Sequence, residues 1–370
     1  MPCLTKIPYT DIAGQHKALK EKLLAAMSDV LEAGEFVLGP QVQEFEERFA
    51  KLCGTKFAVG VNSGTDAIIL ALRALDVGPG DEVITVPNGF ISTLAAVTLT
   101  GARPVLVDVG DDYNLNPHLL EKAITPKTKA IIPVHLTGRP CRMDEILNIA
   151  NEHNVPVVED AAQAVSAEFN GQKVGSFGVA GCFSLHPLKT LNACGDGGVL
   201  TTNVTKIYEA ARVMRNNGFR NRDECVVLSN NSRLDSLQAA VLLVKMDHLD
   251  EWTDARRRLA LVYRRKLAPV KQIQLPPDPP AVKSVYHTFV IQAENRDGLK
   301  DYLKEQGVST KIHYPVPIHL QPAARGLGYK RGDFPAAEKQ SEKILSLPIH
   351  SGLEEEQVNF IARTIQNFYE

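Results

Sequence analysis

The chain has 370 residues, a net charge of −2 at pH 7 and 23% charged residues. Its length is sufficient for two domains with large apolar cores. Nucleic acid is disfavoured as a partner because the charge is near neutral and no basic stripe occurs. No apolar stretch reaches the roughly 20 residues that span a bilayer, and no secretory signal opens the chain, so we expect a cytoplasmic protein without a membrane partner. The six cysteines are far apart and form no CxxC pair, which predicts reduced, mostly buried thiols and no metal site.

Short apolar, β-branched runs alternate with helical patterns through the first two thirds of the chain. Strands are predicted at residues 57–61, 82–86, 104–109, 129–135, 155–159, 181–184 and 198–202. Amphipathic segments at 66–75 and 143–153 lie between them. This alternation predicts an α/β fold with a mostly parallel sheet that helices cover on both faces. Functional groups in such sheets gather at the carboxyl ends of the strands.

The pattern changes near residue 234. We expect a long helix and, after a proline-rich segment at 275–280, one strand and two further helices, at residues 234–268, 287–292, 296–306 and 354–369 respectively. This order predicts a smaller α+β domain at the C-terminal end. The predicted division is a large α/β domain over residues 1–245 and the smaller domain over residues 246–370.

The segment Asn62-Ser63-Gly64-Thr65-Asp66 follows one predicted strand and begins a helix. A glycine at position 64 lets another backbone or a ligand approach closely. The start of a helix has free N–H groups and the positive end of the helix dipole, a combination that binds phosphate. The alternative is an ordinary helix N-cap by Ser63 or Thr65.

Two further residues have side chains that favour chemistry at the same edge of the sheet. Asp160 ends an apolar strand, where a carboxylate needs a partner such as a protonated pyridine nitrogen. Alternatively, it caps a following helix. Lys189 lies in a turn just past another apolar strand, where loss of water would lower its pKa and make its amine a nucleophile toward aldehydes. A solvated surface lysine is the alternative here, and the lack of a GxGxxG after a strand disfavours a dinucleotide-binding fold.

These residues belong to motifs that run nearly end to end through the chain. The motifs are SGTDA at 63–67, PVHLTG at 133–138, EDAAQA at 159–164, GDGG at 195–198, NSRLDSLQAA at 231–240 and HYPVPIHLQPA at 313–323. With them the chain resembles the fold-type-I aminotransferases of the DegT/StrS type, which act on sugars. The resemblance implies pyridoxal 5'-phosphate (PLP) as the cofactor.

The resemblance also implies a role for each matching residue. Lys189 binds the cofactor covalently and then moves the proton between cofactor and substrate, and Asp160 pairs with the ring nitrogen. Other implied cofactor contacts are Gln163 at the ring hydroxyl, the Gly64 and Thr65 backbone with the Ser184 side chain at the phosphate, Phe90 stacked on the ring, and Asn231 at the phosphate of the neighbouring subunit. His313 and Tyr314 lie in a loop that approaches the substrate in relatives.

The implied reaction moves an amino group from glutamate to a nucleotide-linked keto-sugar, in the biosynthesis of an amino sugar. The GDGG motif resembles branches that favour 3-keto over 4-keto sugars. The implied assembly is a homodimer with shared active sites. A PLP aminotransferase acting on a non-nucleotide ketone and a PLP-binding regulatory protein without turnover are the alternatives. Asn217-Gly218 and Leu185-His186 depart from the family pattern and leave the substrate open.

Overall fold

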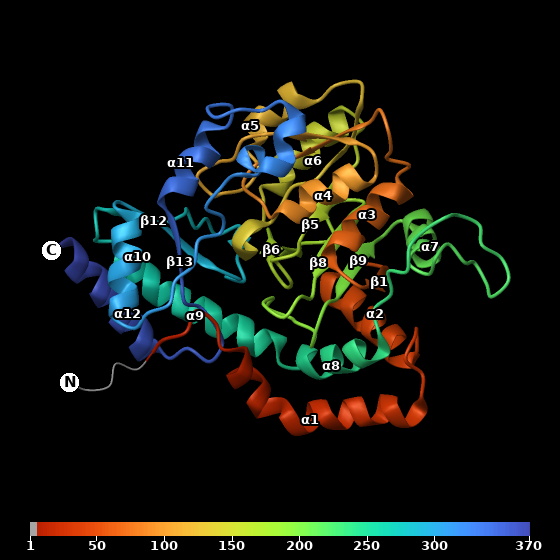
Figure 1. Cartoon of the computed structure of the whole chain (residues 1–370), viewed down its shortest axis with the longest axis horizontal. Coiled ribbons are helices and arrows are strands. Elements are labelled where there is room, and N and C mark those ends of the chain that lie inside the picture. Colours follow the sequence, from red (N-terminus) through yellow and green to blue (C-terminus); the bar gives the residue numbers. More distant parts are fainter. Residues whose placement is uncertain (1–5) are drawn as a thin grey trace.

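The structure, a computed structural model, describes residues 6–370 and is built around one large sheet (Figure 1). Strands β3, β2 and β4 form one ladder, and β1, β9, β8 and β5 form a second. Single bridges from Ile131 to Val157 and from Val134 to Asp160 join β4 to β5, so the two ladders make one sheet. The strands are β1 (Phe57–Val61), β2 (Glu82–Thr85), β3 (Arg103–Leu106), β4 (Thr128–Ile131), β5 (Val158–Asp160), β8 (Ala180–Ser184) and β9 (Gly198–Thr202).

The predicted mostly parallel sheet is confirmed. Strand β9 runs antiparallel to both β8 and β1, whereas the other neighbouring strands run parallel. All seven predicted strands are present; β1 and β9 have the predicted ends, and the ends of the other five differ. The fourth was expected to continue to residue 135 and the fifth to begin at 155. Pro133 and Pro156 interrupt the ladder at these two ends because proline has no N–H to donate.

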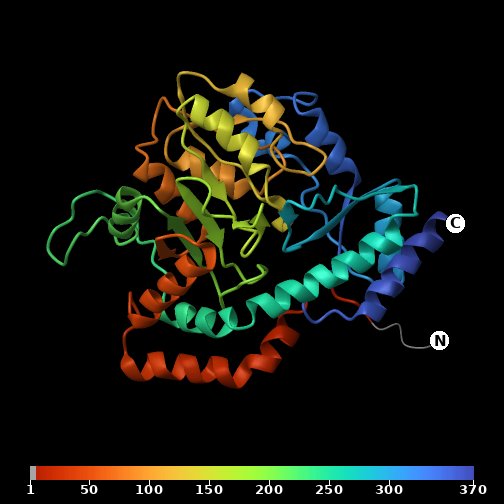
Figure 2. The same cartoon turned by 180° about the vertical axis from the view of Figure 1, so that it is seen from behind.

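Helices cover both faces of the sheet, and the alternation of side chains along β8 shows how (Figure 2). Cys182 packs into the apolar cluster around α3, whereas the next residue, Phe183, packs on the opposite face with Phe45 and Phe49 of α2. The helices of this part are α1 (Ile12–Ala33), α2 (Pro40–Cys53), α3 (Gly64–Ala74), α4 (Ile91–Leu99), α5 (Pro117–Leu120), α6 (Met143–Glu152), α7 (Thr205–Met214) and α8 (Ser236–Met246).

The single helix expected over residues 234–268 is wrong. The chain forms two helices there, α8 and α9 (Leu249–Leu267), with a break at Asp247 and His248. The two helices pack against different partners, α8 against α1 and α2, and α9 against α12 (Glu355–Tyr369). Helical periodicity runs through both and therefore conceals the change of direction. The predicted division at residues 245 and 246 lies in the last turn of α8 and stays a prediction.

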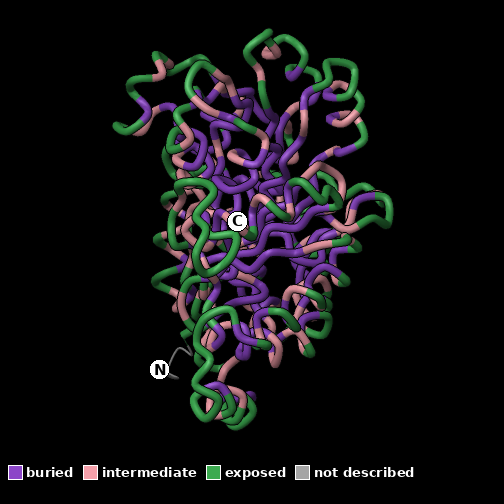
Figure 3. Tube along the Cα trace, turned by 90° about the vertical axis from the view of Figure 1, so that its right-hand side faces the viewer, coloured by how far each residue is buried: buried purple, intermediate pink, exposed green. Residues whose placement is uncertain are grey.

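The C-terminal part has the expected α+β composition. Its central strand β12 (Phe289–Ala293) pairs antiparallel with β10 (Ile273–Gln274) and β13 (Ile344–Leu347). Its other helices are α10 (Arg296–Glu305) and α11 (Pro335–Lys343). A small sheet of β6 (Glu168–Phe169), β7 (Gln172–Lys173) and β11 (Val282–Lys283) connects the two parts, and buried residues run through the middle of the molecule (Figure 3).

The described cysteines are free thiols. Cys53, Cys141 and Cys182 are buried, and Cys194 and Cys225 are exposed. Cys3 lies outside the described residues. Within residues 6–370, no helix is both long and apolar enough to cross a membrane.

Candidate active site

Several of the predicted site residues meet at one edge of the sheet. Asp160 ends β5, Ser184 ends β8, and Gly64 begins α3 just after β1. The reversed strand β9 begins at the same edge with Gly198, the last residue of the GDGG motif. The structure therefore brings the phosphate-binding motif at Gly64, the Asp160 carboxylate and the end of the strand before Lys189 to the same edge, as the sequence predicted.

The start of α3 forms a cradle for an anion. The Ser63 hydroxyl accepts the Asp66 N–H at 3.1 Å, so Ser63 is the N-cap that the sequence allowed. This leaves the first N–H groups of the helix, on Gly64 and Thr65, without intrahelical partners. A Cβ added at Gly64 would lie 2.9 Å from Cβ of Ser184, and one at Gly198 would lie 2.3 Å from the Ser63 carbonyl group. The glycines thus bring the helix start against the strand ends, and the resulting pocket of N–H groups fits a phosphate.

Asp160 is a buried carboxylate without a cation. The Thr93 hydroxyl donates to its Oδ2 at 2.6 Å, and the Ala162 N–H donates to its Oδ1 at 3.1 Å. Among residues 6–370, no side chain forms a salt bridge with it. Turns rather than a helix follow Asp160, so the helix-cap alternative is wrong. A buried carboxylate with two hydrogen-bond donors and no salt bridge fits a ligand with a protonated ring nitrogen.

A second buried carboxylate fixes the backbone of Asp160. The Nδ1 atom of His135 accepts the Cys141 N–H at 3.0 Å, so its Nε2 carries the proton and donates to Oε2 of Glu159 at 3.0 Å. Glu159 also accepts three backbone N–H groups from the turn at residues 175–178. The N–H of His135 in turn donates to the Asp160 carbonyl at 3.0 Å. Glu159 is therefore fully occupied and holds the strand ends together.

Lys189 is not the solvated surface lysine that one alternative expected. Burial lowers the pKa of its amine to about 8, although the negative charge of Asp160 acts in the opposite direction. At neutral pH the amine therefore spends more time uncharged than an ordinary lysine does. A neutral amine beside a carboxylate is suited to attack an aldehyde and to carry a proton.

A buried lysine, Lys245, stabilises the loop that contains Lys189 through hydrogen bonds to Asn192. The Asn192 amide donates to the Lys189 carbonyl at 3.0 Å. Lys245 of α8 is 0% exposed, and its amine donates to Oδ1 and to the carbonyl of Asn192 at 2.7 and 2.8 Å. The Nε2 atom of His16 in α1 lies 2.7 Å from the same amine. Sequence reasoning missed Lys245, because a lysine in an amphipathic helix is usually exposed.

Gln163 and Phe90 both lie beside Tyr314. Oε1 of Gln163 accepts the Thr137 N–H at 2.7 Å, so its amide nitrogen faces the Tyr314 hydroxyl at 3.4 Å. The ring of Phe90 is 52% exposed and its centroid lies 5.5 Å from that of Tyr314. Phe90 is the N-cap residue of α4, whose first turn supplies Thr93. A half-exposed aromatic ring at the start of the helix whose Thr93 contacts Asp160 fits stacking on a planar ligand.

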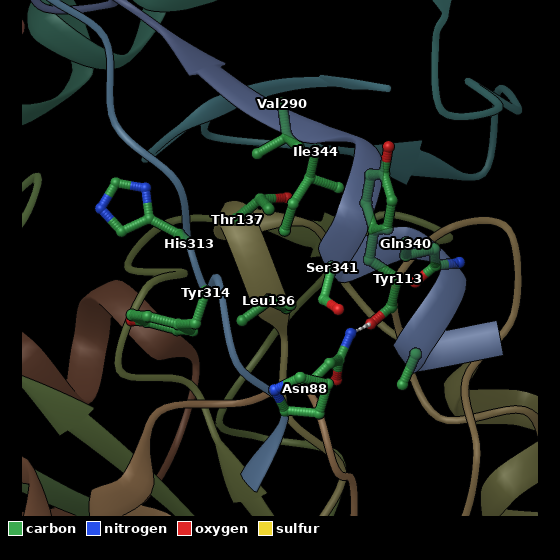
Figure 4. Close-up of a pocket in the computed structure, with 12 residues that line it drawn as sticks. Asn88, Tyr113, Leu136, Thr137, Val290, His313, Tyr314, Gln340, Ser341 and Ile344 are labelled. Carbon is green, nitrogen blue, oxygen red and sulfur yellow. Dashed lines mark hydrogen bonds between the residues drawn. The ribbon is translucent and has the colours of Figure 1, made fainter. Parts of the chain in front are cut away.

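His313 and Tyr314 lie beside each other on one loop and border a small cavity of about 10 Å³ (Figure 4). Tyr113 and Gln340 lie on the other side of this cavity in the same view. The Nδ1 atom of His313 lies 2.9 Å from the Ser346 hydroxyl. Burial and the nearby Lys189 charge lower the pKa of His313 to about 4, so its ring is neutral at neutral pH. His313 also borders a larger cavity, of about 60 Å³, together with Lys189.

Asn231 lies apart from these residues in its own chain. It is exposed and forms a backbone bridge with Asn216. Helix α8 begins only at Ser236 with Asp235 as its N-cap, so Asn231 does not cap this helix. Within the described part of the chain, no hydrogen bond joins its side chain to the cradle at Gly64.

Fold and site together define a fold-type-I, PLP-dependent aminotransferase. Residues 17–366 match the model of the DegT/DnrJ/EryC1/StrS aminotransferase family, and the chain belongs to that family. A crystal structure of DesV from S. venezuelae in complex with a ketimine intermediate superimposes with a TM-score of 0.97, at 42% identity over 99% of each chain.

Three relatives match over nearly the full length. A protein named dTDP-3-amino-3,4,6-trideoxy-alpha-D-glucose transaminase, from Streptomyces venezuelae, is 42% identical over 99% of this chain and 97% of its own. One named UDP-N-acetyl-3-dehydro-alpha-D-glucosamine 3-aminotransferase, from Acidithiobacillus ferrooxidans, is 43% identical over 98% of both. One named a pleiotropic regulatory protein, from Geobacillus stearothermophilus, is 42% identical over 98% of both.

Proposed function

We propose that this aminotransferase moves an amino group from glutamate to a nucleotide-linked 3-keto sugar, in the biosynthesis of an amino sugar. The observation that carries the proposal is the full-length similarity to relatives whose names specify 3-amino and 3-dehydro sugars on two different nucleotides. The GDGG motif, which ends at the start of β9, supports the same preference because it resembles branches of the family that favour 3-keto sugars.

Each side chain of the site has a distinct task in this proposal. The cofactor supplies an aldehyde that takes up the amino group and a ring that withdraws electrons. Asp160 stabilises the positive charge on the ring nitrogen, and Phe90 and Gln163 fix the plane of the ring. The phosphate is bound by the Gly64 and Thr65 N–H groups and by the Ser184 hydroxyl. Lys189 would hold the cofactor at its aldehyde carbon and, once the incoming amine has displaced it there, its free amine would move the proton at that carbon.

The loop with His313 and Tyr314 contacts the sugar in this proposal. Burial raises the pKa of Tyr314 to about 12, so its hydroxyl keeps its proton, and His313 is neutral for the reason given above. Both rings can therefore form hydrogen bonds with sugar hydroxyl groups without adding charge. These two neutral rings therefore suit contacts with the hydroxyl groups of an uncharged sugar ring.

The site is shared between two subunits in the proposed homodimer. A long loop after α7, at residues 216–231, extends away from the body of the chain (Figure 1). It exposes Leu228 by 93%, together with Val226 and Val227. Exposed apolar side chains that occur together mark a surface for another protein. In a twofold dimer each loop would reach the neighbouring subunit, and Asn231 would contact the phosphate there.

Mixing of two inactive variants tests the shared site. Lys189→Ala and Asn231→Asp homodimers should each be impaired, the second because a carboxylate would face the phosphate. A heterodimer has one site with both defects and one with neither, so activity should recover toward half per heterodimer once subunits exchange. Mass spectrometry of differently tagged subunits measures the exchange. No recovery after proven exchange would place Lys189 and Asn231 in one site of a single chain.

Turnover with a panel of nucleotide-linked keto-sugars tests the substrate. With glutamate as the donor, 3-keto sugars should be aminated at least about tenfold more efficiently in kcat/KM than their 4-keto isomers, which corresponds to the loss of one well-placed hydrogen bond in the transition state. Chromatography and mass spectrometry of the product identify the aminated sugar. Preference for a 4-keto isomer, or for a ketone without a nucleotide, would contradict the proposal. If no keto-sugar is aminated and glutamate also causes no change in the absorbance of the cofactor, the result would favour the regulatory role that one relative's name records.

A further inference from the structure

The larger cavity beside Lys189 has a second charged group that the reaction steps above do not use. It is enclosed by the chain start, the Lys189 loop and the C-terminal part, and its lining includes Arg256 of α9, Thr288 and His350. Its volume of about 60 Å³ is several times the roughly 10–15 Å³ that one water needs, so it has room for a carboxylate group. Because Lys189 is also part of the lining, a group bound here borders the reacting amine.

Arg256 has no acidic partner. Its Nη1 atom donates to the Ile349 carbonyl at 2.7 Å and, at 3.3 and 3.5 Å, to the carbonyls of Tyr286 and His287. Its Nε and Nη2 atoms donate to no residue in the described part of the chain, and no salt bridge involves it there. A guanidinium group with one edge fixed on carbonyl groups and the other edge free is preorganised to bind a carboxylate.

Other polar groups around the cavity are also without partners. The Thr288 hydroxyl is buried and forms no hydrogen bond, and Nδ1 of His287 is in the same state. Both ring nitrogens of His350 are buried and lack a hydrogen bond of normal geometry, although the Pro8 carbonyl is close enough to favour the protonated ring. Thr288 is 5% exposed and His350 is 6% exposed. Unpaired buried polar atoms cost free energy unless a ligand satisfies them. Several of them around one cavity indicate a binding site rather than a packing defect.

The charges around the cavity favour an anion. Burial lowers the pKa of Arg256 to about 10, so it is still cationic at neutral pH. Burial and the Arg256 charge lower the pKa of His350 to about 4, so its ring is neutral and retains one N–H to donate. Asp11 is the acidic residue of the lining, and its Oδ1 already accepts the Gly14 N–H at the start of α1. The positive charge of Arg256 therefore lacks a counterpart in the interior.

We propose that this cavity binds the carboxylate of the amino acid that donates the amino group, with Arg256 as its cation and Thr288 and His350 as neutral donors. The inference rests on the proposed function, in which an amino acid and a sugar use the same cofactor in turn. The donor has its carboxylate on the carbon next to the reacting nitrogen, so its binding site must border Lys189. The sugar is uncharged at its reacting end and has no use for a buried guanidinium group.

Binding of glutarate to the holoenzyme tests the site directly, because glutarate has the donor's carboxylates but no amine to react. Arg256→Gln should weaken glutarate binding about 10- to 100-fold, as expected for loss of a charged hydrogen-bonding partner. Thr288→Val has nearly the same shape and removes only an unpaired hydroxyl, so it should weaken binding about 3- to 10-fold with no loss of stability. Arg258→Gln, at an exposed position two residues along α9, is the matched control and should bind like the parent. Calorimetry measures the affinities.

The two half-reactions then identify which substrate uses the cavity. The absorbance change of the cofactor with glutamate alone should require about 10- to 100-fold more glutamate in Arg256→Gln, whereas the return reaction with keto-sugar should be unchanged. A defect confined to the sugar step would assign the cavity to a phosphate of the nucleotide and overturn the proposal. Unchanged glutarate binding in folded Arg256→Gln and Thr288→Val would overturn it as well. If Arg256→Gln does not fold, Thr288→Val decides. The glutamate step needs no sugar, so failure of the sugar panel leaves this test intact.

Discussion

Lys189→Ala should abolish transamination, with a loss of at least about 10⁴-fold in kcat, because the variant lacks the amine that moves the proton. It should still bind the cofactor, since the cradle at the start of α3 and the Asp160 carboxylate are unchanged. The measurement is turnover with glutamate and a keto-sugar, together with the cofactor content after dialysis. Lys206→Ala, at an exposed lysine of α7, is the control and should keep parental activity.

Covalent labelling distinguishes a direct role of Lys189 from a structural one. The parent protein should be yellow, and borohydride should fix the cofactor on the peptide that contains Lys189. Peptide mass spectrometry locates the label. A label on another lysine, or turnover of Lys189→Ala near the parental rate, would overturn the assignment.

Asp160→Asn should lower kcat by about 10²- to 10³-fold, as does removal of a major preorganised charge. The amide has the same shape and can still accept the Ala162 N–H at its oxygen, so the fold should be retained. What is lost is the negative charge that keeps the ring nitrogen protonated. Initial rates of both half-reactions measure the effect, and both should fall because both use the same ring.

Asp144→Asn is the matched control for the loss of a carboxylate. Asp144 is exposed in the first turn of α6, and its replacement should leave both half-reactions unchanged. Near-parental rates in Asp160→Asn would mean that Asp160 serves only the hydrogen bonds to Thr93 and Ala162. Circular dichroism of each variant separates lost activity from lost structure.

The sequence predicted the sheet and one edge of the site well because both depend on local patterns. Apolar runs between turn residues located all seven strands, and Asp160 and Ser184 could be placed because strand ends are visible as the end of such a run. The motif at Gly64 could be located for the same reason. The antiparallel direction of β9 could not be predicted, because hydrophobic periodicity carries no information about strand direction.

Residues that act across long separations could not be found from periodicity. Thr93 contacts a carboxylate 67 positions away, and the Lys245 amine bonds to a loop 53 positions away. Arg256 looked like one of several charged residues on an amphipathic helix. Only the folded chain shows that its charge points inward, and only the missing acidic partner shows that the position is unusual.

The pair of buried lysines at the Lys189 loop has a consequence for chemical selectivity. Burial lowers the pKa of both Lys189 and Lys245 to about 8, so their amines are similarly ready to react with a carbonyl compound. Lys245 is sealed by the core and has acceptors at Asn192 and His16, whereas Lys189 opens on a cavity. Access, not basicity, therefore decides which amine an aldehyde can reach. The fold protects one activated lysine by burying it and leaves the other open to the cofactor.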